Sequence, residues 1–265
     1  MKIHVLFGGS PQLFETGEEL YNAYAGLTCP RPETELIMKP LKVGLTELEH
    51  YDYTYFQLLN AQQASEGLLQ AEKEGADAAI MCCFFDPGLR NARGVCRIPV
   101  LGLAESSMLF ASLMGRKFAI VVPRPGQIPV EEDLLVLYRL RSLAIDHMPI
   151  RSLRNHLSAG IERQPDETDM EVAVEDFLNV SRACMEDGAE VIIPGCSMLS
   201  MALALANVTQ VDDAVVVDPL TSAVKLAEAM VDLGQGGRPW ISRNLMYKSP
   251  AEEDVAQIRK MFGLT

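Results

Sequence analysis

The sequence lacks long apolar runs and is short of basic side chains. Its 265 residues include 23 Lys and Arg against 36 Asp and Glu, so the formal net charge is −13. Such a surface repels phosphate backbones and acidic lipids, so we expect neither a nucleic-acid nor a membrane partner. No stretch approaches the ~20 apolar residues of a membrane-spanning helix. The N-terminal segment predicts a first strand rather than a signal peptide, and we therefore expect a cytoplasmic protein.

Recognisable metal-binding spacings are also absent. The four histidines, His4, His50, His147 and His156, are scattered, and no C-x-x-C, H-x-x-H or H-E-x-x-H pattern occurs. We therefore expect no metal site. None of these histidines lies at a useful spacing from a cysteine, which argues against a Cys-His nucleophile.

Six cysteines are present, at positions 29, 82, 83, 96, 184 and 196. A chain of this length and apolar content does not need disulfide bonds for stability, so we expect free thiols. A free cysteine is most often a small buried hydrophobic residue. A further pattern is needed to decide which of the six have chemical roles.

Short apolar segments alternate with longer segments of helical periodicity. Strands are expected near residues 3–7, 34–39, 77–83, 98–103, 117–122, 143–150, 189–194 and 213–218. Helices are expected over residues 56–75, 104–115, 131–140, 169–187, 219–234 and 251–262. This alternation predicts an α/β fold whose parallel sheets are covered by helices on both faces.

The most informative feature is an internal repeat. Residues 74–83, EGADAAIMCC, align with residues 187–196, DGAEVIIPGC, at a constant offset of 113 residues. A helix, Gly, acid and strand in this order are common in α/β proteins. A cysteine at the same strand end in both copies is much less readily explained by chance, and it distinguishes Cys83 and Cys196 from the other thiols.

The repeat predicts a site between two halves of the chain. In open α/β sheets the active crevice lies at the carboxyl ends of the strands, where both cysteines are expected. If a pseudo-two-fold axis relates the halves, the two thiols enter one cleft from opposite sides. Backbone N–H groups at a helix start favour the thiolate form and so lower the pKa of a cysteine thiol. The arrangement suits proton transfer by two opposed bases.

Four segments, taken in order, resemble a known enzyme family. They are CFFDPGL at 83–89, IPVLGLAESSM at 98–108, IPGCSM at 193–198 and DPLTSAVKLAE at 218–228. From about residue 70 to 235 the chain resembles the aspartate/glutamate/hydantoin racemase superfamily, and most of all its hydantoin and allantoin racemase branch. The resemblance implies two pseudo-symmetric lobes, each a mainly parallel sheet flanked by helices, with the active cleft between them. We assign residues 1–115 and 220–265 to lobe 1 and residues 116–219 to lobe 2.

The resemblance also implies a mechanism without a cofactor. Cys83 and Cys196 would be the catalytic pair, one a thiolate base and the other a thiol acid, acting on a carbon next to a carbonyl. Cys82, on the opposite side of the strand, is expected to be packed. The resemblance implies a small-molecule substrate that is hydantoin-like or allantoin-like. It also allows a homo-oligomer, although nothing in the sequence fixes the oligomeric state.

Several further residues are expected to bind the substrate. We assign an oxyanion-holding role to the backbone amides that follow the two cysteines, those of Phe84, Phe85, Ser197 and Met198. Gly9 and Ser10 follow the first strand and form either a ligand-contacting turn or an ordinary strand-to-helix turn. Arg124 either pairs with a carboxylate or is a solvated loop charge.

Other acidic residues near these segments have structural interpretations. Glu105 and Asp218 are expected to stabilise helix starts, and Asp86 is expected to be a turn or cap residue.

The sequence departs from the hydantoin branch at several of these positions. Members usually have an Asn-Pro-Asn-Ser/Thr turn after the first strand, where this chain has Phe7-Gly8-Gly9-Ser10-Pro11. They have Gly where Phe85 stands, and Thr or Ser where Pro123 follows a strand. We expect Phe85 to shrink or reshape the pocket, so the substrate is less well specified than the chemistry.

Three alternatives to racemisation remain open. A cis-trans isomerase of the same superfamily would use one cysteine to attack an olefin, and a decarboxylase would need only one cysteine for reprotonation. A non-enzymatic alternative is a redox- or ligand-sensing α/β protein, in which the adjacent Cys82 and Cys83 oxidise reversibly.

Overall fold

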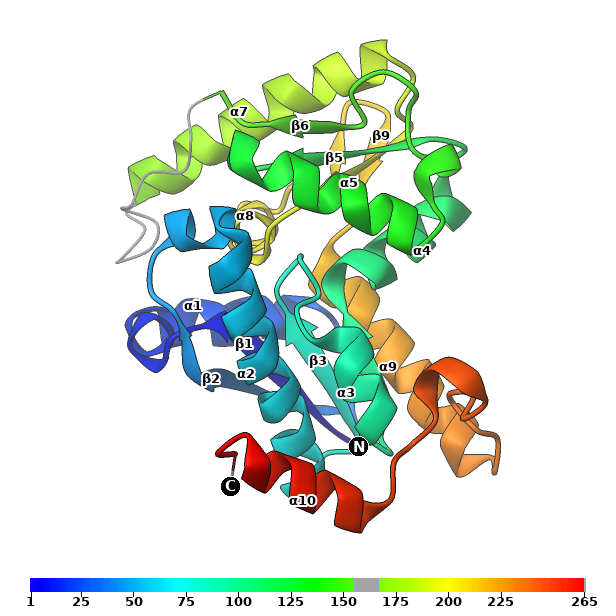
Figure 1. The fold of residues 1–265 in the computed structure, drawn as a ribbon. Coiled ribbons are helices and arrows are strands. Elements are labelled where there is room, and N and C mark those ends of the chain that lie inside the picture. The colour runs from blue at the N-terminus through cyan, green and yellow to red at the C-terminus, as the bar shows by residue number, and fades with distance from the viewer. Residues whose placement is uncertain (155–166, 265) are drawn as a thin grey trace.

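The computed structural model describes residues 1–154 and 167–264, and His156 lies outside this part. It contains two separate β-sheets with helices packed around them (Figure 1). The first half of the chain forms β1 (Lys2–Gly9), α1 (Pro11–Leu27), β2 (Glu35–Leu45), α2 (Thr54–Lys73), β3 (Ala78–Cys82), α3 (Leu89–Val95), β4 (Val100–Gly102) and α4 (Leu103–Met114).

The second half begins at β5 and builds the other sheet. Its elements are β5 (Phe118–Val122), α5 (Ile128–Leu137), β6 (Ile150–Ser152), α7 (Glu167–Glu186), β7 (Val191–Pro194), α8 (Ser197–Leu205), β8 (Gln210–Val211) and β9 (Ala214–Val216). The chain then forms α9 (Pro219–Gln235) and α10 (Glu252–Met261). Short 3-10 turns cover Leu48–Asp52, Pro125–Gln127, Arg141–Leu143 and Leu245–Tyr247.

Strand order confirms that the two halves repeat one topology. The first sheet has the order β2-β1-β3-β4, and the second begins β6-β5-β7-β9 before the short antiparallel strand β8 is added. In each half the first strand therefore pairs with the second and the third, and another parallel strand, β4 or β9, pairs with the outer side of the third. The other pairings in both sheets are parallel. The predicted α/β fold with two mainly parallel sheets is confirmed.

The strands that precede the two cysteines are buried throughout. Every residue of β3 and of β7 is shielded from solvent, as expected for parallel strands with helices on both faces. One apolar cluster includes residues from both sheets, such as Ile80 and Ile192. A second, smaller cluster lies between the first sheet and α2 and α3, and includes Leu68 and Leu89. The halves are therefore joined by a shared core.

The structure corrects the expected elements at three places. The strand expected near 143–150 is wrong, because β6 begins only at Ile150 and Ala144 makes a single isolated bridge. Met148 has a left-handed φ of 45° and Pro149 has no N–H to donate, so the segment before Ile150 cannot continue a ladder. Two helices were not expected: α1, which begins after the cap at Ser10, and the short α3.

The strands of the two sheets lie within the two predicted lobe ranges, and the exact lobe boundaries stay a prediction. Helix α9 follows the second sheet in the sequence but packs against β3, β4 and α4 (Figure 1).

Asp218 caps the start of this helix by accepting a hydrogen bond from the backbone N–H of Thr221 at 2.6 Å. It also accepts one from the Tyr24 hydroxyl of α1 at 2.7 Å. These contacts support its interpretation as a helix-start residue.

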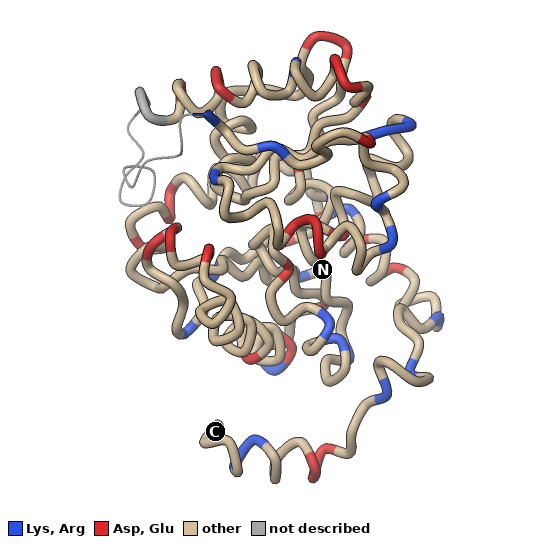
Figure 2. The backbone as a smooth tube through the Cα atoms, turned by 45° about the horizontal axis from the view of Figure 1, so that its top comes forward, with Lys and Arg blue, Asp and Glu red and all other residues tan. Residues whose placement is uncertain are grey.

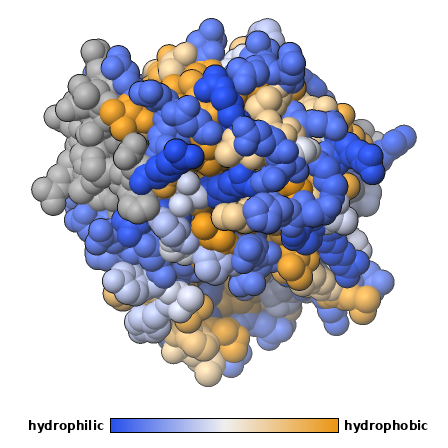
Figure 3. All heavy atoms as spheres, turned by 90° about the horizontal axis from the view of Figure 1, so that it is seen from above, coloured by the Kyte–Doolittle hydropathy of each residue, from blue (hydrophilic) through white to orange (hydrophobic). Residues whose placement is uncertain are grey.

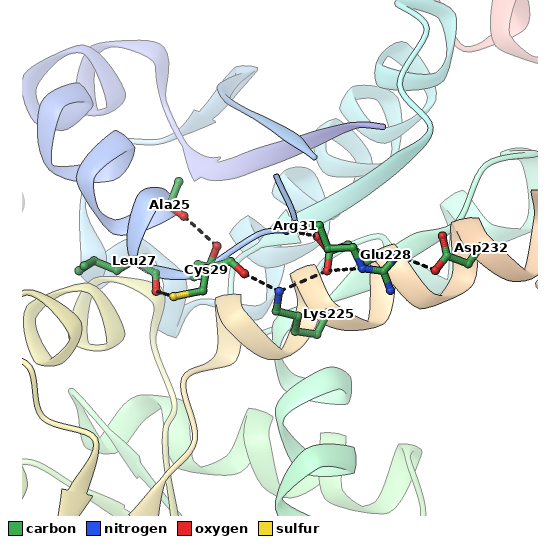
Figure 4. A network of polar contacts seen from close by, with 8 residues as sticks. Ala25, Leu27, Cys29, Arg31, Lys225, Glu228 and Asp232 are labelled. Atoms are coloured by element: carbon green, nitrogen blue, oxygen red, sulfur yellow. Dashed lines mark hydrogen bonds and ion pairs between the residues drawn. The ribbon is translucent and has the colours of Figure 1, made fainter. Parts of the chain in front are cut away.

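A polar network fastens α9 to the loop after α1 (Figure 4). Glu228 is almost fully buried, and its carboxylate accepts a hydrogen bond from the Arg31 backbone N–H at 2.8 Å. Lys225 lies 3.3 Å from Glu228 and also donates to the Cys29 carbonyl. Arg31 pairs in addition with Asp232 at 2.6 Å. The chain segments that flank the first sheet are thus tied together across almost 200 residues of sequence.

Charged residues of both signs are interspersed along the chain in Figure 2. The face seen in Figure 3 is mainly hydrophilic, with small apolar patches between the polar side chains. Among the described residues no helix combines the length and apolarity that crossing a bilayer would require.

Candidate active site

Cys83 directly follows β3, at the carboxyl end of the first sheet. Gly8, at the end of the neighbouring strand β1, leaves the room that this side chain occupies. A Cβ atom added to Gly8 would lie 2.9 Å from the Cys83 Cβ and 3.5 Å from its Sγ. The Gly8 carbonyl is held in place by hydrogen bonds from the Tyr51 hydroxyl at 2.9 Å and the Asn60 amide at 3.2 Å. The glycine turn therefore has a packing role beside the thiol.

Cys196 follows β7 and lies at the corresponding end of the second sheet. It is the N-cap residue of α8 and is 9% exposed. Its carbonyl accepts hydrogen bonds from the Ser200 backbone N–H at 2.9 Å and the Ser200 hydroxyl at 2.8 Å. Helix α8 thus begins at the thiol, as the repeat predicted.

The two cysteines line one cavity, of about 50 Å³, between the sheets. Five of the residues predicted to bind substrate line it with them: Gly9, Phe84, Phe85, Ser197 and Met198. Cys82 also contributes to the wall, but it is 3% exposed and packs in the shared core.

Ser10 and Arg124 lie outside the lining of this cavity. Ser10 is buried and its hydroxyl accepts a hydrogen bond from the Leu13 N–H at 3.2 Å, which caps α1. Arg124 donates to Asp52 at 2.7 Å and lies 3.4 Å from Glu49. Both side chains therefore have structural partners, and their roles in substrate binding stay predictions.

The acidic residue of the loop after Cys83 caps a helix. Asp86 is buried, and its carboxylate accepts hydrogen bonds from the N–H groups of Ala104 at 3.1 Å and Glu105 at 3.0 Å, in the first turn of α4. The Tyr138 hydroxyl, from the second half of the chain, donates to the same carboxylate at 2.7 Å. Burial raises the pKa of Asp86 to about 7 despite these donors. The interpretation of Asp86 as a cap residue is confirmed.

Four residues near the thiols were not identified from the sequence. Tyr51 packs its ring edge-on to Phe85, with 6.3 Å between ring centroids. Gln127 lines the cavity, and its Oε1 has no hydrogen-bond partner among the described residues. Gly195 also lines the cavity, and fully buried Glu131 lies behind it. In the sequence, Glu131 could have been singled out as an acidic residue within the partly apolar segment 128–137.

The expected lowering of the thiol pKa values is wrong for this structure. Burial raises the pKa of the Cys83 thiol to about 12, although the backbone N–H of Phe85 favours the thiolate. Burial likewise raises the pKa of Cys196 to about 11, against the opposing effect of the Met198 and Leu199 amides. The helix-start amides act in the predicted direction, but desolvation of the charged sulfur outweighs them.

This balance predicts a steep pH dependence of thiol reactivity. Without substrate, alkylation of Cys196 by iodoacetamide is expected to accelerate about tenfold per pH unit from about pH 7 to about pH 10, because only the thiolate reacts. Mass spectrometry of the labelled Cys196 peptide over a pH series measures this rate. A plateau near neutral pH would show that the helix-start amides overcome burial.

No group of histidine, cysteine and carboxylate side chains suited to a metal ion occurs within residues 1–154 and 167–264. Glu105, at the start of α4, pairs instead with Arg93, whose Nη1 donates to Oε1 at 3.1 Å and whose Nη2 donates to Oε2. The polar side chains that line the described cavity are those of the cysteines, Tyr51, Gln127 and Ser197.

Comparisons with known proteins agree with this architecture. The sequence profile of the Asp/Glu/hydantoin racemase family matches residues 55–227. A hydantoin racemase of Pseudomonas sp. (strain NS671) is 30% identical over 99% of this chain and 97% of the relative. One of Rhizobium meliloti is 33% identical over 80% of this chain and 87% of the relative.

A solved structure shares the fold. Allantoin racemase from Klebsiella pneumoniae superposes with a TM-score of 0.76 at 24% identity, covering 95% of this chain and 94% of that one. The sequence similarity extends over most of the chain, and the two-sheet fold is shared. Together they assign the chain to a family. The chain belongs to the Asp/Glu/hydantoin racemase family, with hydantoin racemases among its relatives, and is an isomerase.

Proposed function

We propose that the protein is a cofactor-independent racemase in which Cys83 and Cys196 transfer protons at a carbon next to a carbonyl. The observation that supports this most is the position of the two thiols. Each follows the third strand of its sheet, and both line one cavity. A planar carbanion between them would be accessible from both faces, which inversion of a stereocentre requires.

In the proposed reaction one cysteine acts as a thiolate and removes the α-proton, so a C–H bond breaks and an S–H bond forms. The electron pair delocalises onto the carbonyl oxygen as an enolate. The opposite thiol then gives its proton to the other face of the carbon, and it becomes the thiolate. No electron is gained or lost, and the reverse reaction uses the cysteines in exchanged roles.

Backbone amides are proposed to hold the enolate oxygen. Ser197 is the first residue of α8, so its N–H has no acceptor within the helix. The N–H of Phe84 occupies the equivalent position after Cys83. The amides of Phe85 and Met198 favour the thiolates in this structure. We propose that these four amides share the negative charge as it moves between sulfur and oxygen.

The cavity favours a compact neutral substrate. No Lys or Arg is among the described residues that line it, and the nearby Arg124 is paired with Asp52 and Glu49. A substrate with a free carboxylate would find no counter-cation there. A cyclic ureide such as a hydantoin presents instead uncharged carbonyl and N–H groups, and the relatives named above are called hydantoin and allantoin racemases. We therefore propose a small hydantoin-like or allantoin-like substrate.

Incorporation of solvent deuterium tests this proposal. We expect the enzyme to place deuterium on the α-carbon of one enantiomer of a 5-substituted hydantoin or of allantoin, with loss of optical activity, and not on aspartate or glutamate. Proton NMR and polarimetry follow both events, with an enzyme-free sample as the control for spontaneous exchange. Absence of enzyme-dependent exchange in every hydantoin and in allantoin would refute the proposed function.

The alternatives differ from racemisation in their substrates and products. Decarboxylation needs only one thiol and releases carbon dioxide from a malonate-type acid. Olefin isomerisation leaves no deuterium at a tetrahedral carbon. A sensor protein would catalyse none of these reactions.

A further inference from the structure

Glu131 is a buried acid that the proposed reaction leaves without a role. It lies in the first turn of α5, four residues after the cavity-lining Gln127, and is fully shielded from solvent. Neither of its carboxyl oxygens has a hydrogen-bond partner among the residues that the structure describes. An uncompensated buried carboxylate is costly, so a structural role alone explains this residue poorly.

The carboxyl group of Glu131 lies beside the backbone of the residue that precedes the second cysteine. A Cβ atom added to Gly195, the residue before Cys196, would lie 2.7 Å from the Glu131 Oε2. It would also lie 2.8 Å from methyl groups of Ile120 and Val122. Only a glycine at position 195 allows an acid to approach the end of β7 this closely, and the other neighbours at this point are apolar.

The charge of Glu131 acts on both thiols. Burial is the main reason that the pKa values of Cys83 and Cys196 are raised; the Glu131 carboxylate adds a smaller effect in the same direction, and Cys196 does so for Cys83. Burial, and then the negative charge of Asp86, raise the pKa of Glu131 itself well above its ordinary value. The titratable groups that face it from neighbouring elements are thus Asp86 and the two cysteines, and all are acids. Two negative charges in the same apolar surroundings oppose each other.

We propose that Glu131 is a positioning residue whose carboxyl group shares a single negative charge with the thiols of Cys83 and Cys196. When either sulfur is a thiolate, Glu131 keeps its proton and the opposite sulfur stays a thiol. When Glu131 ionises, both sulfurs stay protonated. This inference deepens the proposed function, on which its catalytic meaning rests, because a two-base reaction requires one thiolate and one thiol in every turnover.

Such groups titrate as a coupled unit and not one by one. Removing the acid without changing its shape is therefore expected to favour thiolate formation. We compare Glu131→Gln with Glu132→Gln, which makes the same substitution at the next, exposed residue of α5. The readout is the rate of iodoacetamide alkylation of Cys83 and Cys196 between about pH 6 and about pH 11, resolved by peptide mass spectrometry.

In Glu131→Gln we expect alkylation of at least one of the two cysteines at about pH 9 to be ~3–10-fold faster than in the wild type, with its midpoint at lower pH. Glu132→Gln is expected to match the wild type. Wild-type rates and midpoints in Glu131→Gln would overturn the proposal, because neutralising the acid would then leave the thiols unaffected.

A second variant keeps the test decisive if Glu131→Gln does not fold. Glu131→Met replaces the carboxyl group by an apolar side chain of similar length, and the alkylation rates of Cys83 and Cys196 are measured in the same way. We expect the same acceleration as in Glu131→Gln, because the negative charge is removed again. Wild-type rates in a folded Glu131→Met would overturn the proposal. Neither measurement requires turnover, so a failed deuterium experiment would reject the racemase and leave the charge-sharing result standing.

Discussion

Cys83→Ser and Cys196→Ser are each expected to lower the rate of racemisation by about 10³-fold or more while leaving the fold intact. A serine hydroxyl is a far weaker acid than a thiol, so it neither forms the base nor returns the proton effectively. Because each cysteine is proposed to serve one face of the carbanion, the loss of either stops inversion. Polarimetry on a single hydantoin enantiomer measures the effect, and circular dichroism verifies folding.

The pattern of residual exchange distinguishes two bases from one. Each single variant still has one cysteine that can act as the base, so we expect slow deuterium exchange in one enantiomer only, and in opposite enantiomers for the two variants. Cys29→Ser is the matched control, since Cys29 is exposed and does not line the cavity. If both active-site variants racemise as fast as Cys29→Ser, the two-base mechanism is wrong.

The internal repeat allowed the most important parts of this site to be predicted. Apolar segments that end in cysteine at residues 83 and 196 indicated two equivalent strand ends, and the common strand order of the sheets agrees with them. This succeeded because buried parallel strands have a strong sequence pattern. Helix α1 was not predicted because Gly17, Gly26 and several aromatic residues weaken its helical pattern. Its formation depends on the Ser10 cap and on packing of Phe14 and Tyr21 against the sheet.

The rest of the site depends on contacts between distant segments. Gly8, Tyr51 and Gln127 reach one cavity from three parts of the chain, and no local pattern relates them. The predicted direction of the thiol pKa shifts is wrong for a related reason. Sequence shows where a helix begins and hence where amides favour a thiolate, but it does not show how completely the sulfur is removed from water.

Gly102→Ala is expected to cause a large loss of stability near the site, about 3 kcal/mol or more. A Cβ atom at Gly102 would lie 2.3 Å from the Asp86 Oδ1 and 2.4 Å from its Cγ. Asp86 cannot simply rotate away, because two backbone amides of α4 and the Tyr138 hydroxyl bind its carboxylate. Either these hydrogen bonds break, or strand β4 moves away from β3.

The same substitution should also impair the reaction, because the Asp86 N–H donates to the Cys83 carbonyl at 3.0 Å and so links the cap to the thiol. Chemical denaturation measures the stability, and deuterium incorporation measures the activity that remains in the folded fraction. Gly94→Ala is the matched control: it lies within α3, where an added Cβ atom meets nothing within 4 Å. We expect that variant to be unchanged or stabilised by up to about 1 kcal/mol. Equal stability of the two variants would mean that the Asp86 cap does not fix the position of the Cys83 loop.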